Sequence, residues 1–375
     1  MVKVEMVDLK AQMASIGEQI SARIADVLAH GQFIMGPEVV ELEEALSQFC
    51  GAPHTVTCGN GTDALQIALM ADGIGPGDAV FVPGFTFTAT AEAVLVLGAR
   101  PVFCDIDPAT FNLDPESLKD AVDRVRKEGK LIPRAVISVD LFGLPGDYAR
   151  LVPYCDQEGL LLIADSAQAF GAAQGHRNVG VLAPVTTTSF FPAKPLGCFG
   201  DGGALFTDDA QRARLYQSLR AHGKGDEKYD IVRVGLNSRL DTIQAAILLE
   251  KLKIFQGEID ARRRIAHAYT ERLRGHVITP EIPTGTNSVW AQYSIRSDRR
   301  DAIMAAFRHK GLPFAIYYPR PMHHQTAYRE FGLGEGSLPI SENTSETILS
   351  LPMHPYLSDR AINAVCETVL AAVQA

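Results

Sequence analysis

The sequence of 375 residues lacks an excess of basic side chains, with 35 lysines and arginines against 44 aspartates and glutamates. The net charge of -9 and the isoelectric point near 5.6 argue against nucleic acid or an anionic membrane as the main partner, because both select basic surfaces. Any anionic substrate must therefore be met by a few locally placed groups.

Paired cysteines and long apolar runs are also missing. The six cysteines, at positions 50, 58, 104, 155, 198 and 366, include no Cys-x-x-Cys pair and no metal-ligand spacing. We expect them to be small apolar residues in a reducing compartment. The first residues lack the apolar core of a signal peptide, and no run is long enough to cross a bilayer, so we expect a cytoplasmic protein.

Length and apolar content, by contrast, are ample. Hydrophobic residues make up 46% of the chain, and its length exceeds the size at which one core usually stops growing. We therefore expect two domains: a large one over residues 1–250, beginning with a helical arm, and a small one over 251–375. Helical patterns rather than a Gly/Pro linker occupy the boundary.

Strand-like and helical segments alternate, which is typical of an α/β fold with a mainly parallel sheet and covering helices. We expect strands from 55 and at 79–83, 101–105, 135–139, 160–164, 186–190, 204–207 and 290–295. Expected helices are 16–28, one between Gly36-Pro37 and Gly51, one from about 62, and 88–97, 115–128, 148–158, 210–221, 240–255, 259–273, 301–310 and 359–373. The polar stretch 222–237 has no clear period and is predicted to be a long, functional loop.

One lysine has an unusually apolar setting. Lys194 lies between two strand-like runs, among apolar residues and prolines, and glycines follow it at 197, 200, 202 and 203. One interpretation is a partly buried amine with a lowered pKa, able to act as a nucleophile or to form a Schiff base. The other is a lysine whose stem covers apolar surface while its ammonium stays in water. The stretch alone does not decide between them.

Polar residues at strand ends are the next candidates, because ligands of open α/β sheets bind beyond the carboxyl ends of the strands. The turn Gly59-Asn60-Gly61-Thr62 joins a strand to a helix and is a candidate phosphate site, although a plain turn capped by Thr62 explains it equally well. Asp165 ends an apolar strand, with Gln168 three residues later. Such an acid either pairs with a cation or caps the next turn.

Three further residues fit the same edge of the sheet: Phe85 and Phe87 offer an aromatic face, and Ser189 offers a hydroxyl to an anion. A flat, phosphorylated pyridine cofactor needs a Schiff-base lysine, an acid on its ring nitrogen, an aromatic over its face and a helix N-terminus on its phosphate. Each feature alone is weak, but the four together indicate one cofactor.

At these residues the sequence resembles the DegT-type nucleotide-sugar aminotransferases, which have the fold-type I architecture of aspartate aminotransferase and depend on pyridoxal 5'-phosphate. The resemblance runs nearly end to end, and its motifs are Val7-Asp8-Leu9, Gly36-Pro37-Glu38, Cys58 to Leu65, Asp105-Ile106-Asp107, Ser189 to Lys194 and Gly235 to Asp241. It implies an α/β fold with a mainly parallel, seven-stranded type of sheet, helices on both faces and a smaller C-terminal α+β domain.

The resemblance also implies residue roles. Lys194 would bind pyridoxal phosphate and move protons, while Asp165 would pair with its ring nitrogen and Gln168 would contact its ring hydroxyl. Phe87, following the Pro-x-x-Thr pattern, fits the stacking aromatic better than Phe85. The implied phosphate ligands are Gly61, Thr62 and Ser189, together with Asn237 from the second subunit of a homodimer.

The substrates follow from the same resemblance. Family members that dehydrate sugars carry histidine in place of the lysine, so Lys194 favours amino transfer from glutamate to a keto nucleotide sugar. The closest similarity is to O-antigen enzymes acting on C3 of UDP-2-acetamido-2-deoxy-3-oxo-glucuronate. Arg239 and Tyr318 match their substrate-binding positions, whereas Tyr317 stands where a histidine is expected.

Three alternatives stay open at this point. One is a transaminase for a 3-keto or 4-keto 6-deoxy nucleotide sugar. Another is a cofactor-binding regulator without turnover, against which the intact lysine, acid and partner-loop motif argue. The last is a nicotinamide dehydrogenase, which the α/β pattern permits but the incomplete glycine fingerprint disfavours.

Overall fold

The computed structural model describes residues 4–227 and 229–374; residues 1 and 375, the outer ends of the two expected domains, lie outside them. Within the described residues the main sheet has seven strands in the order β1-β9-β8-β5-β4-β2-β3. Only β9 runs antiparallel to its neighbours, and the other pairs are parallel. The strands are β1 His54–Cys58, β2 Asp78–Pro83, β3 Arg100–Cys104, β4 Ile132–Val139, β5 Leu161–Asp165, β8 Val185–Ser189 and β9 Gly203–Thr207. The predicted mainly parallel sheet is confirmed.

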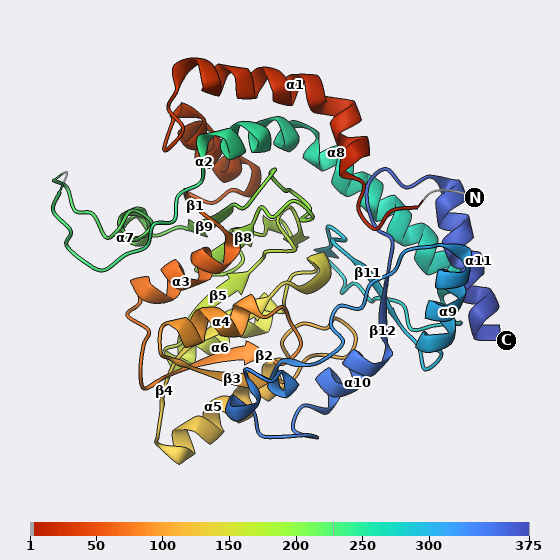
Figure 1. Cartoon of the computed structure of the whole chain (residues 1–375). Coiled ribbons are helices and arrows are strands. Elements are labelled where there is room, and N and C mark those ends of the chain that lie inside the picture. The colour runs from red at the N-terminus through yellow and green to blue at the C-terminus, as the bar shows by residue number, and fades with distance from the viewer. Residues whose placement is uncertain (1–3, 228, 375) are drawn as a thin grey trace.

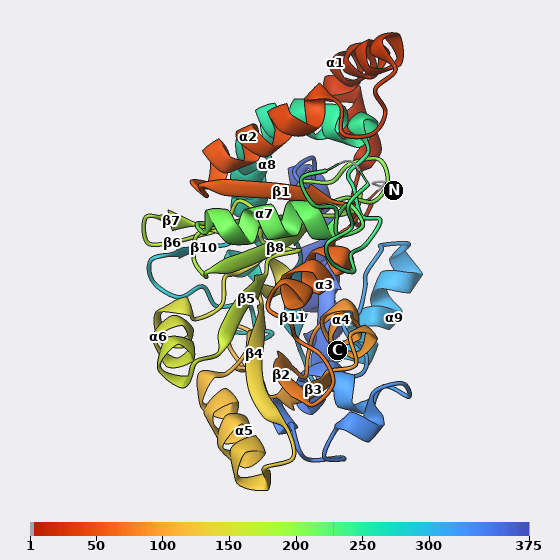
Figure 2. The same cartoon turned by 90° about the vertical axis from the view of Figure 1, so that its left-hand side faces the viewer.

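Helices cover both faces of this sheet (Figure 2). One face packs against α2 Pro37–Cys50, α5 Pro115–Glu128, α6 Tyr148–Glu158 and part of α8 Thr242–Leu273, and the other packs against α3 Gly61–Ala71, α4 Ala89–Val96 and α7 Ala210–Leu219. The strands are buried on both faces, which explains their nearly continuous apolar runs. The long α1 Leu9–His30 packs on α8 at the β1 end of the molecule (Figure 1).

Local signals set the ends of several helices. Before α5, the Asp114 carboxylate accepts hydrogen bonds from the N–H groups of Glu116 and Ser117, and Pro115 occupies the first turn. Gly129 then ends the helix with a φ of 64°, a left-handed conformation that favours glycine. The bounds of α5 and α6 agree with those predicted from the sequence.

A second apolar cluster lies at the C-terminal end of the chain. It contains the two-stranded sheet of β11 Tyr293–Arg296 and β12 Ile348–Leu351, with α9 Arg300–Lys310, α11 Asp359–Gln374 and the second half of α8. Val4 from the N-terminal segment also packs there. The remaining elements are α10 Pro339–Thr347, the short strands β6 Ala173–Gln174, β7 Arg177–Asn178 and β10 Thr286–Asn287, and the 3₁₀ turns Leu141–Gly143, Met322–His324 and Arg329–Phe331.

Two sequence predictions differ from the structure. The helices expected at 240–255 and 259–273 form one helix, α8, because Gly257 keeps helical geometry and its position faces open space. The strand expected from 290 begins at Tyr293, because Trp290 has a φ of 53°, which an extended strand does not allow. Since α8 runs through residue 250, the division at 1–250 and 251–375 stays a prediction. Among the described helices, none is long and apolar enough to cross a membrane.

Candidate active site

The candidate site lies at the carboxyl ends of β4, β5 and β8. Asp165 is the last residue of β5, where it pairs in register with Val139 of β4 and Thr187 of β8. Ser189 ends β8 two residues later. Parallel neighbours therefore bring the predicted acid and the predicted phosphate ligand to one edge of the sheet.

Asp165 is buried and has few partners. Its carboxylate accepts hydrogen bonds from the Thr90 hydroxyl at 3.1 Å and from the Ala167 N–H at 3.3 Å. Burial raises the pKa of Asp165, while the Ala167 hydrogen bond, the nearby Lys194 ammonium and the Thr90 hydrogen bond act in the opposite direction. A cation placed against this carboxylate would favour its ionised form.

Gln168 connects two further parts of the site. Its side-chain oxygen accepts from the N–H of Phe142 at 2.8 Å, and its amide nitrogen donates to the hydroxyl of Tyr318 at 3.2 Å. These two bonds fix the amide orientation. They also bring Tyr318, which is 150 residues away in sequence, to the end of β5.

Aromatic rings form one wall of this region. Tyr318 lies 5.9 Å from Phe85, 6.3 Å from Phe87 and 5.9 Å from Tyr317, measured between ring centroids. Phe85 is buried, whereas Phe87 is 52% exposed. Phe87 thus has an exposed ring surface, and its preference over Phe85 as the stacking aromatic stays a prediction.

Lys194 lies in the turn between β8 and β9 and is partly buried. Its backbone N–H donates to the carbonyl of Phe191 at 2.8 Å, which closes the turn. Burial lowers the pKa of the Lys194 ammonium, and the charge of Asp165 partly opposes this effect. A lysine with a lowered pKa has more of the free amine that a Schiff base requires.

The turn before α3 lies very close to the ends of β8 and β9. Asn60 caps the helix by accepting from the N–H of Asp63 at 2.8 Å. A Cβ on Gly61 would lie 2.7 Å from the Cβ of Ser189, and one on Gly203 would lie 2.5 Å from the backbone of Asn60. Glycine is therefore required for the N-terminus of α3, with Thr62 in its first turn, to lie this close to Ser189, and a phosphate site shared by these residues stays a prediction.

Asn237 and Arg239 belong to the loop before α8, which contacts this turn through Ser238. The Arg239 guanidinium donates to the Asn237 side-chain oxygen, and the Ser238 hydroxyl accepts from the N–H of Gly59 at 2.9 Å. Asn237 itself is exposed. In the described structure no hydrogen bond joins Asn237 or Arg239 to Lys194, and the sharing of Asn237 between subunits stays a prediction.

Two buried residues escaped the sequence analysis. Asp140, directly after β4, accepts from the hydroxyls of Tyr148 and Ser166 and from the N–H of Gly146. Burial raises its pKa to about 7. Like Asp165, Asp140 lies at the carboxyl end of a buried strand, so the search for polar residues at strand ends could have identified it.

Lys251 of α8 is the second such residue. Its ammonium donates to the carbonyl of Gly197 at 2.6 Å and lies 4.4 Å from the centre of the Phe199 ring. Burial lowers its pKa to about 8. Lys251 thereby supports the loop that carries Lys194, a role to which nothing in its sequence context points.

The donor set matches the requirements of pyridoxal phosphate. A lysine with a lowered pKa and a buried acid lie at the ends of adjacent strands. The exposed face of Phe87 and the glycine-lined N-terminus of α3 supply the surfaces for a ring and a phosphate. The residues present therefore fit this cofactor.

Known proteins resemble the whole chain. A model of the DegT/DnrJ/EryC1/StrS aminotransferase family matches residues 14–370. The UDP-2-acetamido-2-deoxy-3-oxo-D-glucuronate aminotransferase of Pseudomonas aeruginosa is 46% identical, covering 97% of this chain and 98% of that protein. Two relatives are 39% identical over 98% of this chain and 97% of their own length: a pleiotropic regulatory protein of Geobacillus stearothermophilus and the UDP-N-acetyl-3-dehydro-alpha-D-glucosamine 3-aminotransferase of Acidithiobacillus ferrooxidans.

Solved structures agree. A DegT DnrJ EryC1 StrS aminotransferase from Brucella abortus is 50% identical, with a TM-score of 0.97 over 98% of this chain and 99% of that one. The NtdA protein of Bacillus subtilis, solved with bound PMP, is 27% identical, with a TM-score of 0.89 over 99% of this chain and 83% of that one.

Proposed function

Because the chain belongs to the DegT/DnrJ/EryC1/StrS aminotransferase family, we propose that it uses pyridoxal 5'-phosphate to move the amino group of glutamate to a keto nucleotide sugar. The acceptor we propose is C3 of UDP-2-acetamido-2-deoxy-3-oxo-glucuronate, in the cytoplasmic synthesis of sugars for surface polysaccharide such as O-antigen. The observation that carries the proposal is the partly buried, pKa-lowered Lys194 beside the buried Asp165. Family membership excludes the nicotinamide dehydrogenase.

The proposed roles follow from these surroundings. Bound pyridoxal phosphate supplies an electron sink that stabilises negative charge on the donor carbon. Lys194 holds the cofactor and carries protons on its Nζ atom, which the lowered pKa makes available as a base. Asp165 holds a proton on the ring nitrogen, and Gln168 orients the ring through its fixed amide.

The remaining residues position the phosphate and the sugar. Gly61, Thr62 and Ser189 hold the phosphate at the N-terminus of α3, and Phe87 stacks on the ring. Tyr317 and Tyr318 line the sugar side, and Tyr318 is held by Gln168 at 3.2 Å. Arg239 suits the C6 carboxylate of a uronate, because a guanidinium binds carboxylates through two parallel hydrogen bonds.

Two relatives favour C3 of a UDP-linked N-acetyl sugar, but they differ at C6. The 46% identical relative acts on the glucuronate and a 39% identical one on the glucosamine. A 3-oxo glucosamine is therefore our second candidate acceptor. Replacing Arg239 by glutamine should lower kcat/KM about 10- to 150-fold for the uronate, the cost of one charge-assisted pair, and much less for the glucosamine.

Product analysis with purified protein tests the assignment. We expect glutamate to remove the visible absorption band of the bound cofactor, and amination to be fastest with the 3-oxo uronate in a panel that includes 3-oxo glucosamine and 4-keto 6-deoxy sugars. Lys194→Ala should abolish transfer. Faster turnover of a 4-keto sugar would overturn the acceptor. A glutamate half-reaction with no acceptor turned over would instead favour a regulator, like the 39% identical pleiotropic regulatory protein.

We further propose a homodimer with shared active sites. Phe33, Ile34 and Met35 are exposed and lie against the start of α8, where the Thr242 N–H bonds to the Phe33 carbonyl. The lysine loop adds the exposed Phe199, whose N–H donates to Gln244 of α8 at 2.8 Å. An exposed apolar patch of this kind is typical of a protein interface.

Hybrid dimers provide the test. Lys194→Ala and Asn237→Ala protomers should each be inactive alone, and mixing them should restore activity in one site of each hybrid dimer. A mixture that stays inactive while hybrids form would contradict a shared site. Sedimentation that gives only monomers would contradict the dimer.

A further inference from the structure

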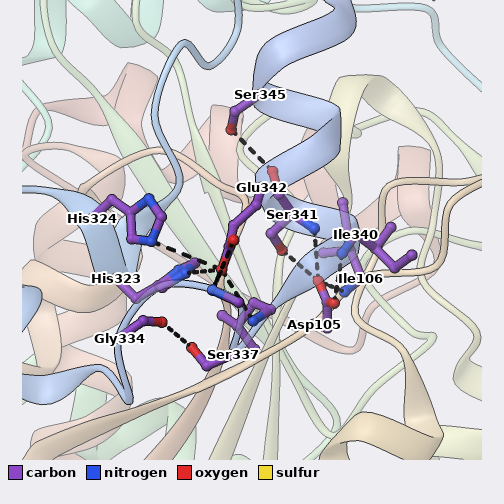
Figure 3. Close-up of polar contacts among 12 residues, drawn as sticks. Asp105, Ile106, His323, His324, Gly334, Ser337, Ile340, Ser341, Glu342 and Ser345 are labelled. Atoms are coloured by element: carbon purple, nitrogen blue, oxygen red, sulfur yellow. Dashed lines mark hydrogen bonds and ion pairs between the residues drawn. The ribbon is translucent and has the colours of Figure 1, made fainter.

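Three potential metal ligands gather outside the candidate active site. His323 and His324 lie in the 3₁₀ turn Met322–His324, and Glu342 comes from α10, which follows 15 residues later. One donor atom from each side chain lies within 4.8 Å of the others. Both imidazole rings point toward the Glu342 carboxylate (Figure 3).

The spacing suits a small tetrahedral ion. The Nε2 atoms of His323 and His324 lie 2.9 Å and 3.8 Å from the same oxygen of Glu342. Zinc bonds of about 2.0–2.2 Å in a tetrahedron place neighbouring ligand atoms about 3.3–3.5 Å apart. Shifts of about half an ångström would bring both pairs to that separation.

Backbone hydrogen bonds hold the proposed ligands in position. Glu342 also accepts from the N–H groups of Gly336 at 2.9 Å and Leu338 at 3.3 Å. The Met322 N–H bonds to the Gly84 carbonyl at 2.7 Å and anchors the turn. The His323 side chain is fully buried, whereas that of His324 is 32% exposed. Hydrogen bonds to the backbone therefore hold the Glu342 carboxylate and the histidine turn in place.

The ring nitrogens of the two histidines differ in their contacts. Nε2 of His323 lies 2.9 Å from the Glu342 carboxylate, while its Nδ1 atom is buried without a hydrogen-bond partner in the described structure. Among the described residues, Nε2 of His324 is buried without a hydrogen-bond partner, so its lone pair is available to an ion.

We propose that His323, His324 and Glu342 form a binding site for a divalent transition-metal cation, with Zn²⁺ as the best fit. Two imidazole nitrogens and one carboxylate oxygen favour zinc over Mg²⁺ or Ca²⁺, which take oxygen ligands. Three protein ligands leave a fourth coordination position for water. The site is independent of the proposed transamination.

The ion would be a structural cross-link close to the aromatic wall. The segment that carries the histidines bonds to the chain on both sides of Phe87: Met322 to Gly84 before it, and the Tyr328 hydroxyl to that of Thr88 after it. At the other end, α10 is capped by Asp105, which accepts from the N–H groups of Ile340 and Ser341 (Figure 3). Metal binding would thus tie α10 to the segment behind Phe87.

Metal titration of the untagged holoenzyme tests the proposal. After chelator treatment, calorimetry with Zn²⁺ and visible absorption with Co²⁺ should each report about one tightly bound ion per chain, and Zn²⁺ should raise Tm. H324A and E342Q should weaken binding at least about tenfold and lose the Tm shift. The control is H309A, because His309 is exposed on α9 and should leave binding unchanged.

The simpler alternative is a His323–Glu342 hydrogen-bonded pair that only fixes α10. It predicts no stoichiometric ion in the wild type, or equal affinity in H324A and H309A, and either result overturns the metal site. H324Q, which keeps much of the volume of the ring, provides a second variant if H324A does not fold. Retention of wild-type affinity by a folded H324Q would be equally decisive against the proposal.

Discussion

Gly61→Ala probes the phosphate turn directly. The new Cβ would lie 2.7 Å from the Cβ of Ser189 and 3.3 Å from its Cα and Oγ atoms. Carbon atoms in favourable contact are about 3.5–4.0 Å apart, so the turn and the end of β8 must separate by about an ångström. This movement displaces the N–H groups at the start of α3 from the position of the phosphate.

The expected loss can be given a size. Overpacking of this kind costs about 1–3 kcal/mol, and a tenfold change in affinity corresponds to about 1.4 kcal/mol. If the strain is relieved by opening the turn, Gly61→Ala should bind pyridoxal phosphate about 5- to 150-fold more weakly. Titrating cofactor-free protein while following the visible absorption band measures this.

Gly257→Ala is the matched control. Gly257 lies inside α8, and a Cβ there meets nothing within 4 Å. We expect unchanged cofactor affinity and up to about 1 kcal/mol of added stability. Ser189→Gly removes the contacting Cβ, so the double variant with Gly61→Ala should bind about as well as Ser189→Gly alone. Wild-type affinity in Gly61→Ala would refute the placement of the phosphate at this turn.

Two further predictions concern the buried ionisable residues. Burial raises the pKa of the Asp140 carboxyl to about 7, so the folded protein binds this proton more tightly than the unfolded chain does. The contribution of this group to stability therefore falls as pH rises from about 4 to about 7. The Tm of Asp140→Asn minus that of the wild type should increase from pH 5 to pH 8, and a difference independent of pH would contradict the burial argument. Lys251→Met removes the donor to the Gly197 carbonyl and should cost about 1–3 kcal/mol in urea unfolding, while Lys10→Met, at an exposed position on α1, should change stability by less than about 0.5 kcal/mol. Equal effects of the two would mean that Lys251 does not support the lysine loop.

Sequence patterns predicted the helices whose ends are set by residues next to them in the chain. Asp114, Pro115 and Gly129 place the ends of α5 because caps act within one turn. The sequence of α10 offers only Pro339 in its first turn as such a signal, and its N-terminus is capped by Asp105, 235 residues away. The two-residue strands β6, β7 and β10 are too short for any period to indicate them.

The residues of the candidate site form the same two groups, those that local sequence predicts and those that depend on contacts between distant segments. Asp165 and Ser189 follow strands, so the topology of a parallel sheet brings them together and sequence reasoning can find them. The contact of Gln168 with Tyr318, and that of Lys251 with Gly197, depend on how distant segments pack. His323 and Glu342 are 19 residues apart, too far for a short ligand motif to indicate the pair.

The continuous helix α8 has a consequence for how the protein unfolds. Its 32 residues span about 48 Å and contribute side chains to both the sheet core and the C-terminal core. Near one end Lys251 bonds to the lysine loop, and near the other the Tyr269 hydroxyl bonds to the Pro352 carbonyl. Melting either core would leave half of this helix without its packing surface, so we expect the two cores to unfold in one cooperative transition.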